Sequence, residues 1–304
     1  MKTTQILNLI NGIIWAIQPD KMDQIMGVIN LRIQGLHASQ ATIDEVTAAA
    51  RQDASLKRNK MVAVLPVVGT LTQRASLMSD MSGLGSTESI AGVFDTLVAD
   101  DTISAIVLDM DTPGGSVHGV QELSDKIYAA RGTKPIVAVA NSCMASAGYY
   151  IGSAADEVVV TLGGQVGSVG VMGVHADHSE ENEKAGVNYE YIVYGEHKAE
   201  DNKNSPLTDK ARGYRQRLVD TYGHQFDADV ARNRGVSAQA VQAGFGQGRM
   251  FIADDAVAAG LADRVDTLEN TIRRFQATTT NRGGRSVKSL QNKLKLQRAK
   301  SSLT

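Results

Sequence analysis

The spacing of the hydrophobic positions changes near residue 60 and divides the chain into two parts. In the first part, one helical stripe carries Ile25, Val28, Ile29, Ile33 and Leu36. The apolar segment 6–17 is predicted to be an amphipathic or buried helix, and a charged run at 57–60 marks the end of this part. Residues 1–58 are therefore predicted to form a helical N-terminal extension.

After residue 60, short β-branched runs alternate with segments of helical spacing. Buried strands are predicted at 62–68, 103–110, 135–140 and 157–160. Helices are predicted at 89–99, from Ser116, and at 147–155. Strands that alternate with helices indicate right-handed crossovers, so the predicted fold class is α/β, with a mainly parallel sheet and flanking helices.

The pattern continues to about residue 270. Further strands are predicted at 166–174, 189–194 and 261–265, and helices at 209–233, from Ser237 and from Asp254. The sequence shows no internal repeat. Residues 59–270 are therefore predicted to form one domain.

The composition is that of an ordinary soluble protein. The 304 residues are 42% hydrophobic and 21% charged, with a formal net charge of −2 at pH 7. This balance argues against capture of nucleic acid by the chain as a whole. Since no apolar stretch reaches the length of a bilayer span, no membrane span is expected. With Cys143 as the single cysteine, no intramolecular disulfide is expected.

The C-terminal end carries charge of one sign. No acidic residue follows Glu269, whereas residues 277–304 contain Arg282, Arg285, Lys288, Lys293, Lys295, Arg298 and Lys300. Residues 271–304 are predicted to be a basic, flexible tail. Two interpretations stay open, a solvated tail or an arm that binds an acidic partner or nucleic acid.

Glycines and a serine follow two neighbouring strands of the predicted sheet. Gly114 and Gly115 end a turn after the strand at 103–110, and Ser146 follows the strand at 135–140. The carboxyl ends of parallel strands meet at one edge, where ligands bind. The amide of Ala147 and that of Gly114 or Gly115 are therefore predicted to form an oxyanion hole beside Ser146.

A serine nucleophile needs a base that takes its proton. Lys198 lies in an isolated Gly-Glu-His-Lys segment, and Lys203 is its rival five residues further on. Lysine acts as a base only when neutral, which burial favours. Two alternatives use other residues: Cys143 as the nucleophile, or a serine triad with His175 and Asp177. The sequence shows no recognisable metal-ligand spacing, so neither a metal nor a cofactor is predicted.

The motifs resemble those of the signal peptide peptidase A family, a relative of ClpP with the crotonase-like fold. The similar segments lie at 111–117, 141–150, 167–171, 195–198 and 205–208. The resemblance implies that Ser146 is the nucleophile and Lys198 the general base, with Ser168 orienting the lysine. It also assigns the oxyanion hole to Gly114 or Gly115 and to Ala147.

Within that family, the chain resembles the phage branch of head maturation, or prohead, proteases. Neither the membrane anchor of cellular members nor a duplicated domain is expected from this sequence, and Trp15–Pro19 is similar to the phage branch. This implies a homo-oligomer that cleaves scaffold, capsid or portal proteins in the host cytoplasm or inside the prohead. The basic tail suits contact with scaffold.

Three other functions stay open at this point. The first is a bacterial enzyme like signal peptide peptidase that degrades peptides. The second is acyl-CoA chemistry on the shared crotonase-like fold, which uses the oxyanion hole without a nucleophilic serine. The third is a non-catalytic assembly protein that only binds scaffold or capsid.

Overall fold

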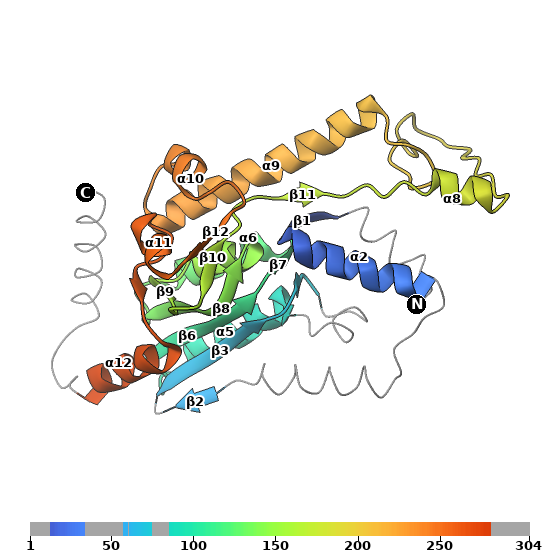
Figure 1. Ribbon diagram of the computed structural model, residues 1–304. Coiled ribbons are helices and arrows are strands. Elements are labelled where there is room, and N and C mark those ends of the chain that lie inside the picture. The colour runs from blue at the N-terminus through green and yellow to red at the C-terminus, as the bar shows by residue number, and fades with distance from the viewer. Residues whose placement is uncertain (1–12, 34–56, 60, 75–84, 281–304) are drawn as a thin grey trace.

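The computed structural model describes residues 13–33, 57–59, 61–74 and 85–280. Three parallel strands form the middle of its main sheet (Figure 1): β3 (Val62–Val68), β6 (Ala105–Thr112) and β8 (Ile136–Ala145). Most side chains in them are buried and many are β-branched, which is typical of strands covered on both faces. The short β2 (Lys57–Asn59) pairs antiparallel with β3 at the outer edge.

The far edge of β8 is shared by two strands, so that β8 organises the whole sheet. Its first half pairs with β9 (Glu157–Val160) and its second half with β10 (Gln165–Gly167), both parallel. Beyond these strands, β13 (Arg264–Val265) pairs with β9, and β12 (Met250–Ile252) pairs antiparallel with β10. These pairings complete a sheet of eight strands within the described residues.

Helices cover both faces of this sheet. One face packs under α5 (Thr87–Ala99), α6 (Val120–Ala129), α7 (Ala147–Gly152), α9 (Asp209–Arg234), α10 (Ala238–Gly244) and α11 (Ala253–Ala258). The other face, with Val64, Val107 and Val139, packs against Phe275 of α12 (Leu268–Thr280). The predicted α/β class, with a mainly parallel sheet and flanking helices, is confirmed.

A second, smaller sheet lies beside the carboxyl ends of the main strands. Its order is β11 (Met172–Gly173), β1 (Ile14–Ile17), β7 (Gly114–Ser116), β4 (Leu71–Thr72) and β5 (Gly85–Ser86). The helix α2 (Pro19–Ile33) follows β1, and its Met22 packs against Trp15 and Ile17. This sheet joins two parts of the chain that the sequence analysis treated separately, the N-terminal extension and the glycine motif.

Four predictions about the elements are wrong. Residues 14–17 form a strand rather than part of a helix, because both edges of β1 are paired. Ser116 belongs to β7, and the helix begins only at Val120, after Gly119 with a positive φ of 78°. Residues 189–194 form no strand. The tail does not begin at residue 271, because α12 continues to Thr280; residues 281–304 lie outside the described part.

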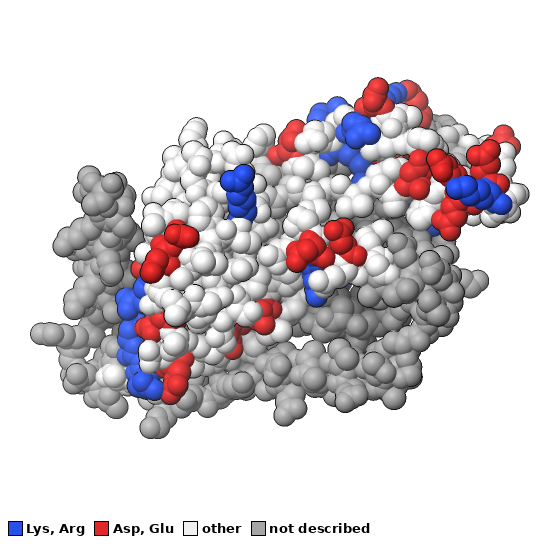
Figure 2. Space-filling model, in the orientation of Figure 1, with Lys and Arg blue, Asp and Glu red and all other residues white. Residues whose placement is uncertain are grey.

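Residues 174–208, which we call the arm, extend from the sheet beyond the N-terminal end of α9 (Figure 1). The arm contains α8 (Ser179–Lys184) and exposes several large apolar side chains, Val187, Tyr189, Tyr191, Ile192, Val193 and Tyr194. Figure 2 shows acidic and basic side chains interspersed on the projecting end, whereas the middle of that face carries few charges. In the described part of this face, charges of both signs therefore lie on the arm, and a group of basic side chains lies at the opposite edge.

Candidate active site

Ser146 occupies a strained turn between β8 and α7. Its φ is 54° and its ψ is −117°, a conformation that is unusual for a residue with a side chain and typical of functional turns. Its N–H donates to the Gly167 carbonyl at 2.8 Å, and its carbonyl accepts from the Tyr150 N–H at 2.9 Å. Its hydroxyl donates to the Gly170 carbonyl at 3.3 Å. The surrounding backbone thus fixes the serine that the sequence singled out.

The glycine motif lies directly against this serine. A Cβ added to Gly114 would come within 2.9 Å of the Ser146 Cβ, so only glycine fits there. The Gly114 N–H donates to Thr112 Oγ1 at 3.1 Å within its own turn. Gly115 pairs with Ala16 of β1, so its N–H can act as an oxyanion donor once a substrate carbonyl takes the place of the Ala16 carbonyl. Ala147 is the first residue of α7, where N–H groups have no acceptor within the helix.

Ser168 lies in the loop that holds Ser146. Gly167 and Gly170, the two residues whose carbonyls accept from Ser146, flank it on either side. Ser168 itself has a positive φ of 53°, is buried, and donates its N–H to the Arg249 carbonyl at 2.8 Å. The structure therefore brings Ser146 and the loop of Ser168 together.

Lys198 lies elsewhere, in an exposed turn of the arm. Its N–H donates to the Gly195 carbonyl at 3.1 Å, and the neighbouring Glu196 pairs with Lys210 at 2.5 Å, at the start of α9. Ser146, in contrast, is completely buried at the edge of the main sheet. In this conformation the structure does not bring Lys198 to Ser146.

The rival bases are also located in the arm. His175 pairs with Asp201 at 3.1 Å and with the Ser205 carbonyl at 3.3 Å, so both ring nitrogens are engaged away from Ser146. Asp177 accepts from the Ser179 N–H instead of contacting His175. The alternative triad of Ser146, His175 and Asp177 is therefore not formed.

Two other features bear on the class of site. Within the described ranges, no group of three or more His, Cys, Asp or Glu side chains is placed to hold a metal ion. In the same part of the chain, no helix is both long and apolar enough to span a bilayer.

Cys143 lies in β8, three residues before Ser146, and its environment disfavours the thiolate. Burial, followed by the carboxylates of Asp111 and Asp20, raises the pKa of Cys143 to about 11. A nucleophilic cysteine needs the opposite shift. The neutral thiol contacts the Gln18 side-chain oxygen at 3.7 Å.

Alkylation of Cys143 by iodoacetamide is therefore expected to accelerate up to about pH 11, because the thiolate forms only there. The rate should be measured by mass spectrometry against the urea-unfolded chain, whose thiol should reach its plateau at lower pH. A plateau at neutral pH in the folded protein would contradict this prediction and reopen the case for a cysteine nucleophile.

Sequence reasoning missed one part of this site, the strand β1. The apolar segment 6–17 looked helical, and nothing local indicates that Ile14–Ile17 pairs with residues about 100 and 160 positions away. The alternation of apolar and polar residues that marks a half-buried strand is also missing here, because all four residues are buried. The single tryptophan, Trp15, was a usable signal, since a large aromatic side chain in a short apolar segment requires a packing partner.

Comparison with known proteins identifies the family. The model of peptidase family S49 matches residues 129–281, which is half of the chain, so the chain belongs to this family. The chain is 34% identical to capsid assembly protease C of Escherichia phage lambda over 215 residues. This match covers 71% of the chain and 48% of that protein.

Other similar proteins include a second phage protein and a bacterial one. The head-tail preconnector protein GP5 of Enterobacteria phage P21 is 32% identical over 248 residues, which cover 80% of the chain and 49% of that protein. Protease 4 of Haemophilus influenzae is 23% identical over 227 residues, covering 74% and 36% respectively. The chain thus spans about half the length of the phage relatives.

Among solved structures, a point mutant of ClpP1 from Listeria monocytogenes aligns with a TM-score of 0.43 and 12% identity. This alignment covers 69% of the chain and 94% of that structure.

Proposed function

We propose that this protein is a serine endopeptidase of phage head assembly, with Ser146 as its nucleophile. The observation that carries the proposal is the strained, backbone-fixed Ser146 packed against Gly114 at the start of α7. Membership of peptidase family S49 and the similarity to phage capsid proteins support it. Its proposed substrates are scaffold, capsid or portal proteins, cleaved inside the prohead or in the host cytoplasm.

In the proposed reaction, the Ser146 hydroxyl attacks the carbonyl carbon of the scissile peptide bond. The negative oxygen that develops accepts hydrogen bonds from the Gly115 and Ala147 amides. Loss of one such donor typically reduces the rate by about 10²–10³. The hydroxyl proton, now donated to the Gly170 carbonyl, must pass to a base and then to the leaving amine. A carbonyl cannot accept that proton, so the base has to enter the site.

We assign that base to Lys198 and the orienting role to Ser168. Lys198 can reach Ser146 in two ways, by movement of its own arm or from the arm of a second subunit in a homo-oligomer. The exposed apolar side chains of the arm, Tyr189 to Tyr194, support the second way, because such surfaces commonly mark subunit contacts.

Lys198→Ala is expected to lower cleavage of a co-expressed scaffold by at least about 10³, since serine is a poor nucleophile without its base. Lys203→Ala, a change of the neighbouring lysine of the same arm, should retain activity. Equal activity of the two variants would contradict the assignment.

A mixture of Lys198→Ala and Ser146→Ala subunits shows whether Lys198 reaches Ser146 within one subunit or from a second subunit. Recovery of activity on mixing places serine and lysine on different subunits. A mixture as inactive as its components, together with an active wild type, places them on one subunit.

One observation favours a competing function, a non-catalytic assembly protein. Ser146 is completely buried and Lys198 lies in the arm, so the described conformation is not ready for catalysis. Co-expression of the wild type with scaffold, followed by mass spectrometry of the termini produced, decides between the two functions. New termini that depend on Ser146 support the peptidase, whereas intact scaffold that co-purifies with the protein supports the assembly role.

A further inference from the structure

The strand β1 lies in a groove next to the proposed catalytic serine. It runs antiparallel between β7 on one side and β11 on the other. Its register pairs Ile17 with Gly114, Ala16 with Gly115 and Trp15 with Ser116. β7 carries the proposed oxyanion donor, and β11 follows the loop that holds Ser146. A peptide entering this site would meet the same two strands.

The carbonyl oxygen of Ala16 lies close to both Gly114 and Ser146. A Cβ added to Gly114 would lie 2.2 Å from the Ala16 oxygen and 2.9 Å from the Ser146 Cβ, so both atoms share the space over Gly114. Flanking bonds join the Gln18 N–H to the Pro113 carbonyl at 3.0 Å and the Val117 N–H to the Ile14 carbonyl at 3.2 Å. Hydrogen-bonded pairs alternate along an antiparallel ladder, so Ala16 faces Gly115 in such a pair.

Other routes to the glycine strand are closed. The second edge of β7 pairs with β4, whose Leu71 is completely buried. A Cβ at Gly115 would lie 2.0 Å from the Leu71 oxygen, which shows how closely the two backbones approach. Ser146 has no exposed surface. A substrate can therefore pair with β7 only where β1 now lies.

The side chain of Ala16 leaves a cavity beside it largely unfilled. Trp15 and Ile17 face Met22 on α2, whereas Ala16 belongs to the main core and lines a cavity of about 190 Å³. Its wall combines apolar side chains with polar ones: Val117, Tyr150, Val171 and Phe226 on the one hand, and Gln73, His118, Gln121, Glu122, Tyr222 and Gln225 on the other. A cavity of roughly 150 Å³ holds a benzene molecule, so this one has room for a larger apolar side chain than alanine.

We propose that β1 is a resident occupant of the peptide-binding groove, which a substrate peptide replaces by pairing with β7 and β11. Such a peptide gains what β1 lacks, a side chain that fills the cavity beside Ala16. β1 therefore restricts the site to extended segments that bind better than it does, and it holds Ser146 covered until then. This inference rests on the proposed function, because it takes Ser146 and Gly115 as the centre of the site.

Trp15 offers a direct measurement, since it is the only tryptophan of the chain and is 1% exposed. The Ser146→Ala protein should be titrated with two dye-labelled peptides that copy residues 13–18 with phenylalanine for tryptophan. One peptide keeps alanine at the position of Ala16 and the other carries leucine there. We expect both to shift the Trp15 emission to longer wavelength, with half-saturation at least about tenfold lower for the leucine peptide.

Two substitutions at Ala16 test whether β1 competes with the peptide for the same place. Ala16→Leu fills the cavity from within, so the peptide concentration for half-saturation should rise about tenfold. Ala16→Gly removes the methyl group, so that concentration should fall. Wild-type Trp15 emission and cooperative thermal unfolding before titration show that each variant folds with β1 in place. Equal half-saturation in the two variants would overturn the proposal.

The outcomes also separate this inference from the proposed function. If dye anisotropy shows that the peptide binds while the Trp15 emission stays unchanged, the peptide has bound elsewhere, for example at the second edge of β11. This result overturns the inference. So does the absence of binding in a protein whose wild type cleaves scaffold. Displacement of Trp15 in a protein whose wild type cleaves nothing supports the groove and contradicts the peptidase.

Discussion

Ser146→Ala is expected to reduce scaffold cleavage by a factor of about 10⁶, the largest effect of any single change in this chain. The Ser146 hydroxyl is the only group proposed to form the covalent intermediate, and nothing else in the turn replaces it. Cys143, the neighbouring candidate, is held in its neutral form, because burial raises its pKa to about 11. Termini produced from a co-expressed scaffold should be quantified by mass spectrometry.

The same change should leave stability almost unaltered. The hydroxyl makes a hydrogen bond of 3.3 Å to the Gly170 carbonyl, and loss of such a bond costs about 1 kcal/mol. The matched control is Ser153→Ala, another buried serine, at the end of α7. Its hydroxyl donates to the Tyr150 carbonyl at 2.9 Å and accepts from Asn233 at 3.0 Å. This variant should lose more stability and keep its catalytic rate.

Ser146→Ala also tests the other chemistry open to an oxyanion hole. Acyl-CoA reactions stabilise a thioester enolate and need no nucleophilic serine, so they would survive the change. A fluorophosphonate probe should label the wild type at Ser146 and leave the variant unlabelled. Full activity of the unlabelled variant would contradict the peptidase proposal.

The sequence predicted the elements whose signals are local. The run 62–68 coincides with β3, and 157–160 coincides with β9, because strands buried on both faces read as continuous apolar runs. The long helix predicted at 209–233 is α9, which begins after the capping Thr208 and ends at Gly235 with a φ of 71°. Caps and turns of this kind depend on neighbouring residues alone.

The elements that the sequence did not predict depend on distant partners. β1 and β7 contain four and three residues, and each is a strand because strands distant in the sequence pair with both of its edges. Ser146 and Gly114 could be placed together because two parallel strands end at one edge of a sheet. Lys198 follows no such strand, since residues 189–194 remain irregular, and nothing in its surroundings fixes its distance from Ser146.

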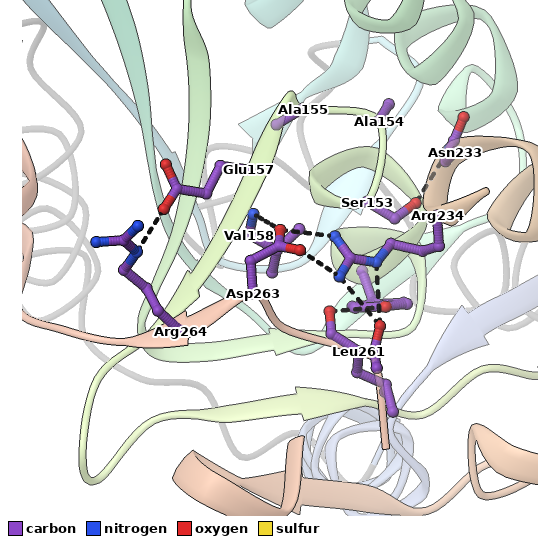
Figure 3. Close-up of polar contacts among 12 residues, drawn as sticks. Ser153, Ala154, Ala155, Glu157, Val158, Asn233, Arg234, Leu261, Asp263 and Arg264 are labelled. Atoms are coloured by element: carbon purple, nitrogen blue, oxygen red, sulfur yellow. Dashed lines mark hydrogen bonds and ion pairs between the residues drawn. The ribbon is translucent and has the colours of Figure 1, made fainter. Parts of the chain in front are cut away.

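The second large effect concerns stability, at the buried pair of Arg234 and Asp263 (Figure 3). The Arg234 guanidinium donates to both Asp263 oxygens, at 2.9 and 3.0 Å, and to the Gly260 carbonyl at 3.0 Å. The Asp263 carboxylate also accepts from the Val158 N–H at 2.7 Å. Burial alone lowers the pKa of Arg234, but the Asp263 carboxylate, together with Tyr149 and Glu157, outweighs burial and raises it. The pair thus joins the end of α9 to β9.

Asp263→Ala is expected to lower the free energy of unfolding by about 3–5 kcal/mol, measured by urea denaturation, because it leaves the Arg234 charge buried without a partner. Adding Arg234→Met removes that lone charge, so the double variant should lose less than the sum of the two single variants. The exposed pair of Arg273 and Glu269, at 2.6 Å, is the matched control. Glu269→Ala should cost less than about 1 kcal/mol.

Additive losses in the Asp263 cycle would contradict the role of the buried charge. If the cycle behaves as expected, cleavage by Asp263→Ala should fall only as far as its folded fraction falls. The pair stabilises the layer that supports β9 and β8, whereas Ser146 and its contacts perform the chemistry. A loss of rate in fully folded Asp263→Ala would instead show that the position of β8 transmits strain from α9 to the turn of Ser146.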